Sequence, residues 1–151
     1  MTMKTPVISN RRAYHDYHIF EKFECGIALS GSEVKSLREA RAALGDSFAR
    51  IDNGEIFLHN VHIDTFDKTG SFKEDTRRVR KLLLHKKEIG KLFNQVTQKA
   101  LLLIPLRMYF NNRGIVKVEL GLSKGKKLYD KRETIKRRDS ELEMKRAMRR
   151  K

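Results

Sequence analysis

The last 28 residues constrain most strongly how this chain can fold. Residues 124–151 read KGKKLYDKRETIKRRDSELEMKRAMRRK and contain 13 Lys and Arg against 5 Asp and Glu, a net charge of +8 within the +15 of the 151-residue chain. A segment with so many charges and so few large apolar side chains cannot bury a core of its own. We therefore expect a folded domain in residues 1–123 and a basic tail in residues 124–151, disordered alone and helical on a polyanionic partner.

Two segments alternate between apolar and polar residues, the pattern of a strand with one buried face. Between residues 17 and 29, every odd position except Glu21 is apolar. Between residues 115 and 122, four apolar residues alternate with Lys117, Glu119 and Gly121. Both segments are predicted to be strands of one barrel or sheet.

The remaining elements follow from turn and helix signals. Strands are predicted at residues 47–51, 55–63 and 100–110, with a tight hairpin turn at Asn53-Gly54. Ser32 is predicted to cap a short helix whose inner side carries Val34 and Leu37. Within residues 85–99, apolar side chains recur at the spacing of an amphipathic helix; they are Ile89, Leu92, Phe93 and Val96.

These elements together predict the fold class. Five or six antiparallel strands, with a helix inserted before the last hairpin, suit a mainly β fold with inserted helices. The predicted architecture is a small antiparallel barrel of the OB type followed by the basic tail.

The net charge of +15 predicts a large anionic partner, and RNA, DNA and an anionic membrane surface all meet that criterion. A membrane is the least suitable of the three. The longest apolar run, Ala100–Leu106, has seven residues and contains Pro105, far short of a spanning helix. The first residues lack the apolar region of a signal peptide, and the tail has no wide apolar face.

Cations and aromatic residues are interspersed along the chain, which favours RNA among the polyanions. Cations can hold phosphates, while flat rings stack on unpaired bases. For any one cluster, the alternative is an ordinary solvated surface. The clusters are Arg11-Arg12, Arg77-Arg78, Arg80-Lys81, Lys86-Lys87 and Lys124/Lys126/Lys127, with the rings of Tyr14, Tyr17, Phe20, Phe72 and Tyr129 between them.

No catalytic, metal or cofactor site is predicted. Glu24, Glu33 and Glu39 could serve acid/base or metal chemistry, but no metal-binding spacing accompanies them. On a basic face, Glu24 is better suited to accept hydrogen bonds from base or ribose donors. The single cysteine, Cys25, is expected in the core and is consistent with a reducing, cytoplasmic setting. His59 and His62 would lie on opposite faces of a strand and could not share a metal.

Leu82–Leu84 follows the cations of residues 77–81 and is expected to supply core strand residues. The alternative interpretation exposes one leucine to pack against a sugar or a base.

Five segments, in this order, resemble a known family. They are NRRAYHDY (10–17), FECGIALSGSEVKSLRE (23–39), RRVRKLLLHKKEI (77–89), PLRMYF (105–110) and VKVELGLSKGKKLYDKR (116–132). The family is small protein B, the SsrA-binding proteins of bacterial trans-translation. The resemblance implies an OB-like barrel that binds the tRNA-like domain of transfer-messenger RNA and delivers it to stalled ribosomes. It also implies indirect partners through the RNA, namely elongation factor Tu and alanyl-tRNA synthetase.

The resemblance also assigns roles to particular residues. Asn10, Glu24 and Leu83 would contact transfer-messenger RNA, which favours the exposed leucine. The tail would enter the decoding site and become helical there; its matching residues are Gly125, Lys126, Lys127, Asp130, Lys131 and Arg132, with Tyr129 as a ring that stacks on ribosomal RNA. A structural ribosomal protein and an RNA-processing enzyme remain alternatives, although the enzyme would need an acid, His or metal cluster that the sequence does not display.

Overall fold

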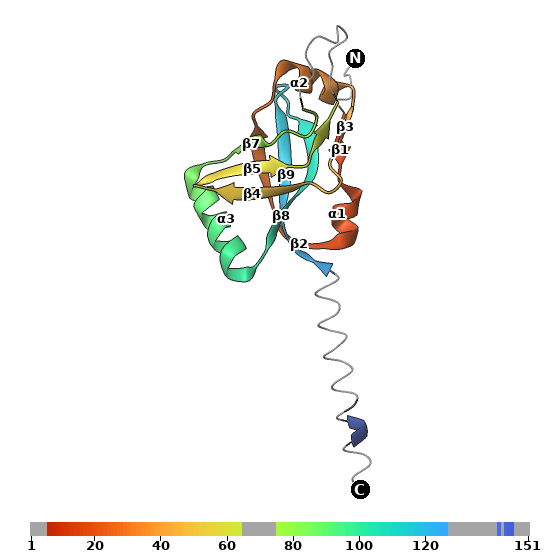
Figure 1. The fold of residues 1–151 in the computed structure, drawn as a ribbon, viewed down its shortest axis with the longest axis vertical. Coiled ribbons are helices and arrows are strands. Elements are labelled where there is room, and N and C mark those ends of the chain that lie inside the picture. Colours follow the sequence, from red (N-terminus) through yellow and green to blue (C-terminus); the bar gives the residue numbers. More distant parts are fainter. Residues whose placement is uncertain (1–5, 65–74, 127–141, 143, 147–151) are drawn as a thin grey trace.

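A computed structural model describes residues 6–64, 75–126, 142 and 144–146. Within these residues, six strands close into an antiparallel barrel in the order β8-β4-β5-β7-β2-β9, and β9 pairs back with β8 (Figure 1). Their bounds are β2 (Tyr17–Ile27), β4 (Phe48–Asp52), β5 (Glu55–His59), β7 (Arg80–Leu83), β8 (Leu102–Phe110) and β9 (Val116–Gly125). The predicted mainly β, OB-like barrel is therefore confirmed.

Short strands and three helices complete the domain. The short strand β1 (Ile8–Ser9) pairs with β8, and β3 (Ala42–Ala43) pairs with β6 (His62–Ile63) outside the barrel sheet. The helices are α1 (Arg11–Asp16), α2 (Gly31–Arg38) and α3 (Lys86–Lys99). The sequence predicted α2 and α3, but it indicated neither β1 nor α1.

The predicted hairpin turn at Asn53-Gly54 is confirmed. Both residues have positive φ, 50° and 75°, and they connect Asp52 directly to its partner Glu55. Two consecutive residues with positive φ match the right-handed twist of the flanking strands, and Asn and Gly tolerate that conformation best. The predicted strand over residues 55–63 is interrupted at Asn60, which also has positive φ, so it becomes β5 and β6.

Helix α2 begins two residues earlier than predicted. The N-cap is Ser30, not Ser32: the Ser30 hydroxyl accepts from the Glu33 amide at 3.3 Å, and the Glu33 carboxylate accepts from the Ser30 amide at 3.0 Å. This reciprocal pair is a capping box. The sequence Ser30-x-x-Glu33 carried the signal, but the neighbouring Ser32 obscured it.

The barrel interior holds most of the apolar side chains that the sequence predicted to be buried, but Phe93 of α3 is 48% exposed. Val116, Val118, Leu120 and Leu122 of β9 are all buried, as are Ile89 and Leu92 of α3. Cys25 is 1% exposed, as expected for a core residue. Burial, reinforced by Glu88 and Glu24, raises the pKa of its thiol to about 12.

Strand β9 continues beyond residue 123, where the sequence suggested that the tail would begin. Lys124 pairs with His18 and Gly125 pairs with Tyr17, so both residues belong to the barrel sheet. Most of the tail, including residues 127–141, lies outside the described residues. No helix in the described part of the chain is long and apolar enough to cross a membrane.

Candidate nucleic-acid interface

Glu24 lies on the outer face of the barrel, in the middle of β2, where it is exposed. The register places it directly opposite Glu119 of β9. Glu119 accepts from the Arg107 guanidinium at 3.1 Å and 3.0 Å, and Lys22 Nζ lies 3.9 Å from its other oxygen. One of the two facing carboxylates is therefore balanced by cations.

A phenol contacts the other carboxylate. The Tyr109 hydroxyl donates a hydrogen bond to Oε2 of Glu24, and the Arg107 guanidinium carbon lies 4.5 Å from the centre of the Tyr109 ring. Burial raises the pKa of Tyr109 to about 12, and the hydrogen bond and charge of Glu24 add to the shift. The phenol therefore keeps its proton and remains a donor at neutral pH.

Leu83 lies beside Glu24 on this outer face. It pairs with Gly26, which follows Glu24 by two residues on β2 and therefore points the same way. Leu83 is 52% exposed, whereas Leu82 is buried, so the exposure of one leucine is confirmed and an all-core leucine run is wrong; its contact with RNA stays a prediction. The Leu83 side chain covers Gly26, where an added Cβ would lie only 3.2 Å from Cβ of Leu83.

Asn10 lies in a different environment, because its side chain is buried and bonded within the protein. Nδ2 donates to the carbonyl of Pro105 at 2.9 Å and to that of Leu44 at 3.4 Å, while Oδ1 accepts from the Ala13 amide at 3.3 Å. Asn10 therefore caps α1 and fixes it to β8, and it is only 6% exposed. The structure does not bring it to the face shared by Glu24 and Leu83.

The first residues of the tail, at positions 125 and 126, lie next to α1. Gly125 ends β9, and Nζ of the next residue, Lys126, donates to the backbone carbonyl of Tyr14 at 2.9 Å. The remaining residues assigned to the decoding site lie outside the described residues; they are Lys127, Tyr129, Asp130, Lys131 and Arg132.

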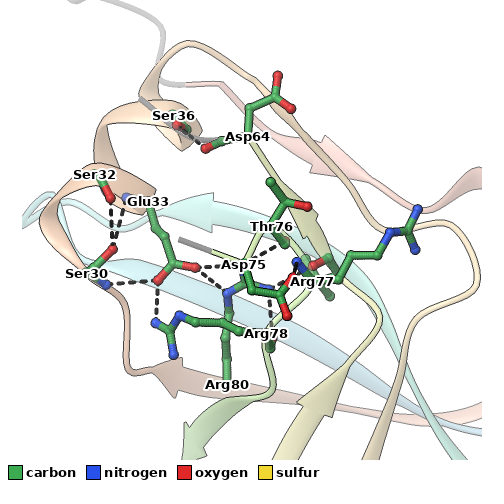
Figure 2. Close-up of polar contacts among 11 residues, drawn as sticks. Ser30, Ser32, Glu33, Ser36, Asp64, Asp75, Thr76, Arg77, Arg78 and Arg80 are labelled. Atoms are coloured by element: carbon green, nitrogen blue, oxygen red, sulfur yellow. Dashed lines mark hydrogen bonds and ion pairs between the residues drawn. The ribbon is translucent and has the colours of Figure 1, made fainter. Parts of the chain in front are cut away.

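Two of the cations expected at a nucleic-acid surface instead form an internal cluster with Glu33 (Figure 2). Arg80 is fully buried; its Nε donates to Glu33 at 2.6 Å, and its other nitrogens donate to backbone carbonyls, including that of Val61 at 2.7 Å. Arg78 donates to the other Glu33 oxygen. Grouping Arg80 with Lys81 as surface cations was therefore wrong for Arg80.

The electrostatics of this cluster follow from its burial and its hydrogen bonds. Burial alone would raise the pKa of Glu33, but hydrogen bonds from Arg78, the Ser30 amide and Arg80 outweigh it, so the pKa lies below its ordinary value. Burial lowers the pKa of Arg80, and Glu33 partly opposes this shift. The cluster joins α2 to β7 and to the segment before it through two structural ion pairs.

Exposed cations remain around the barrel. Arg11, Arg12, Arg77, Lys86 and Lys87 are all exposed, and Lys81 next to Leu83 makes only a surface contact of 3.3 Å with Glu55. Among the described residues, no three His, Cys, Asp or Glu side chains are arranged to hold a metal ion. Exposed cations are suited to contact phosphates, and the face with Glu24 and Leu83 offers a hydrogen-bond acceptor beside an apolar side chain.

A family model described as "SmpB protein" matches residues 7–150 of the chain. The chain belongs to the SmpB family. The match includes all five segments on which the resemblance was based, and it spans both the barrel and nearly all of the tail.

Curated relatives carry the description SsrA-binding protein. The Moorella thermoacetica protein is 54% identical over 143 residues, which cover 95% of this chain and 92% of that protein. The Geotalea uraniireducens protein is 57% identical over 133 residues, covering 88% and 87%. This chain is thus similar to SmpB-family proteins over almost their whole length.

A solved structure has a similar fold. It is described as "tmRNA-SmpB: a journey to the center of the bacterial ribosome", and its matching chain is 52% identical with a TM-score of 0.68. The match covers 80% of this chain and 85% of that one.

Tyr109 was not predicted as part of the SmpB-family site. It lies in PLRMYF, a segment that contributed to the resemblance, but its distance of 85 residues from Glu24 concealed the contact. Only the closure of β8 onto β9, and of β9 onto β2, brings the phenol to the carboxylate.

Proposed function

We propose that this chain is a non-enzymatic RNA-binding adaptor of trans-translation, which binds transfer-messenger RNA at its tRNA-like domain and delivers it to stalled ribosomes. Membership of the SmpB family and the description of the relatives as SsrA-binding proteins support this. The observation that carries the proposal is the position of Glu24 beside exposed Leu83 on one outer face of the barrel.

This face is suited to selective recognition of RNA. A carboxylate repels phosphates but accepts hydrogen bonds from base amino groups and from ribose hydroxyls. An exposed leucine adds an apolar contact with a sugar or a base, while exposed cations such as Lys81 hold the backbone. The protein would therefore distinguish one folded RNA from other polyanions.

Asn10 is proposed to support RNA binding through α1, because its own polar atoms are bonded internally. By capping α1 it holds Arg11 and Arg12, both exposed, in a fixed orientation. In this role Asn10 positions cations toward the RNA.

The tail is proposed to act on the ribosome, in the decoding site, where phosphates would neutralise its charge and allow a helix to form. Gly125 and Lys126 would set the direction in which it leaves the barrel. Elongation factor Tu and alanyl-tRNA synthetase would be indirect partners through the RNA, and the complex would be cytoplasmic.

A binding titration tests the proposal. The protein is titrated with the tRNA-like domain of transfer-messenger RNA, in the presence of ordinary tRNA as competitor, at several salt concentrations. We expect the tRNA-like domain to stay bound in the presence of excess tRNA. A plot of the logarithm of its binding constant against the logarithm of the salt concentration should have a slope of about −0.7 to −0.9 for each of a few contacted phosphates.

Equal affinity for both RNAs with a steep salt slope would contradict the proposal. It would indicate general polyanion binding, as in a structural ribosomal protein. Such a protein would copurify with all ribosomes, whereas an adaptor should accompany stalled ones.

A further inference from the structure

The β2–β9–β8 face contains two carboxylates with unequal partners. Glu24 and Glu119 lie directly opposite each other, an arrangement in which like charges repel. Arg107 and Lys22 pair with Glu119, whereas no ion pair of Glu24 is present within the described part of the chain. Glu24 therefore keeps an uncompensated negative charge on the outer face of a strongly basic protein.

The Tyr109 hydroxyl fixes the orientation of this charge. Tyr109 pairs with Lys117 of β9, and Lys117 pairs with Gly26 of β2, so the phenol and Glu24 extend from the same face across one intervening strand. The hydroxyl donates to Oε2 of Glu24, so Oε1 can accept from another donor. The half-buried Tyr109 ring is itself held by the Arg107 guanidinium, which also bonds Glu119.

We infer that Tyr109 is a positioning residue for RNA recognition, whose hydroxyl holds the Glu24 carboxylate so that its second oxygen accepts from a base amino group or a ribose hydroxyl. This inference rests on the proposed function, in which Glu24 contacts RNA. A freely rotating carboxylate would lose side-chain entropy on binding, and a fixed one has already lost it.

The chemistry of the ligand follows from the charge at this point. A phosphate would be repelled, so the group that Glu24 accepts from must be a neutral or positive donor on the RNA. Because burial raises its pKa to about 12, Tyr109 remains a donor near neutral pH. Tyr109 therefore contributes to selection among RNAs and little to general affinity.

Four variants test this role: Tyr109→Phe, Glu24→Ala, the double variant, and Thr97→Val as a control that also removes a hydroxyl. Thr97 lies on α3, and its hydroxyl donates to the backbone carbonyl of Phe93 at 2.8 Å. Affinities are measured for the tRNA-like domain of transfer-messenger RNA and for ordinary tRNA, with melting temperatures to confirm folding.

We expect Tyr109→Phe to weaken binding of the tRNA-like domain about tenfold, the size typical of a lost hydrogen bond to a charged group. Binding of ordinary tRNA and the salt slope should stay within about twofold of the original protein, because no phosphate contact is lost. In the Glu24→Ala background, the same substitution should add less than about twofold, since the carboxylate it orients is absent. Thr97→Val should change neither affinity.

Other outcomes overturn the inference. Unchanged or tighter binding by Tyr109→Phe, an equal loss for both RNAs, or a full additional loss in the double variant would each exclude a role through Glu24. If Glu24→Ala does not change RNA affinity, or if the original protein does not prefer the tRNA-like domain, both the proposed function and the role of Tyr109 are contradicted. If Glu24→Ala selectively loses affinity for the tRNA-like domain and Tyr109→Phe does not, only the inference about Tyr109 is contradicted.

Discussion

At the scale of single residues, burial decides the role of each charge. Arg80 and Lys81 are adjacent in the sequence, yet Arg80 is fully buried against Glu33, and Lys81 is exposed with a surface contact to Glu55. Strand β7 alternates its side chains between the interior and solvent, so one cation stabilises the fold while its neighbour is available to a partner.

The first prediction compares these two neighbours. Arg80→Met should lower the free energy of unfolding by about 3 kcal/mol, because it leaves the buried Glu33 carboxylate without one of its two guanidinium partners. Lys81→Met should change it by only about 0.5 kcal/mol, the range of exposed ion pairs. Urea unfolding of both variants measures the difference, and equal effects would show that Arg80 is not buried in solution.

The same cluster predicts a dependence of stability on pH. The folded pKa of Glu33 lies below its unfolded value of 4.5, so its ionised form stabilises the fold fully above pH 4.5. That contribution is lost as the pH falls below 4.5 through the folded pKa. The stability difference between the original protein and Glu33→Gln should therefore shrink on acidification.

Urea unfolding at several pH values, from about 6 down to about 3, measures this difference. If the difference in free energy of unfolding between the two proteins is constant with pH, or increases in acid, Glu33 does not ionise more easily in the folded state. Arg50→Gln, on an exposed part of β4, is a control that changes the charge without touching the cluster.

At the scale of elements, α2 depends on the capping box formed by Ser30 and Glu33. Ser30→Ala should destabilise the protein by about 1 kcal/mol, because it leaves the Glu33 amide without an acceptor. Ser32→Ala is the matched control, two residues along and inside the helix, and should have a smaller effect. Thermal unfolding compares the two, and a larger loss for Ser32→Ala would assign the cap to Ser32.

The neighbouring strands β2 and β7 form the outer face on which Glu24 and Leu83 meet. Gly26 favours this arrangement, because an added Cβ would lie 3.2 Å from Cβ of Leu83 and would require Leu83 to shift. Neither strand alone defines the site, since Glu24 and Leu83 are far apart in the sequence and adjacent only through the pairing of Gly26 with Leu83.

At the scale of the whole molecule, we expect the barrel to bind RNA and the tail to act on the ribosome. A chain that ends after Lys126 should keep its stability to within about 0.5 kcal/mol, because the β2–β9 pairing and the Lys126–Tyr14 bond remain. Its affinity for the tRNA-like domain should remain largely intact, while peptide tagging on stalled ribosomes is abolished. Melting temperature, a binding titration and a tagging assay measure these three properties.

A chain that ends after Ser123 provides the comparison. It also loses the pairing of Lys124 and Gly125 with β2, so it should be less stable by about 1 kcal/mol. Near-complete loss of RNA affinity in the longer truncated chain would overturn the division between barrel and tail.

Periodicity and turn chemistry predicted most of the barrel, because strand alternation and the Asn53-Gly54 turn depend on nearby residues. They also placed Cys25 in the core and α3 before the last hairpin. The short elements β1 and α1 were missed, since elements of two and six residues have too little periodicity to be recognised.

The candidate site was predicted only in part. The family resemblance identified Glu24 and Leu83 as candidate RNA contacts. The proposed role of the tail motif in the decoding site still rests on that resemblance alone. The sequence by itself determined that the chain is basic and that its core is a β barrel, and it predicts that the last residues do not contribute a core. The tertiary structure decided that Arg80 and Asn10 are buried and that Tyr109 reaches Glu24, because burial and contact depend on strand pairings between residues far apart in the chain.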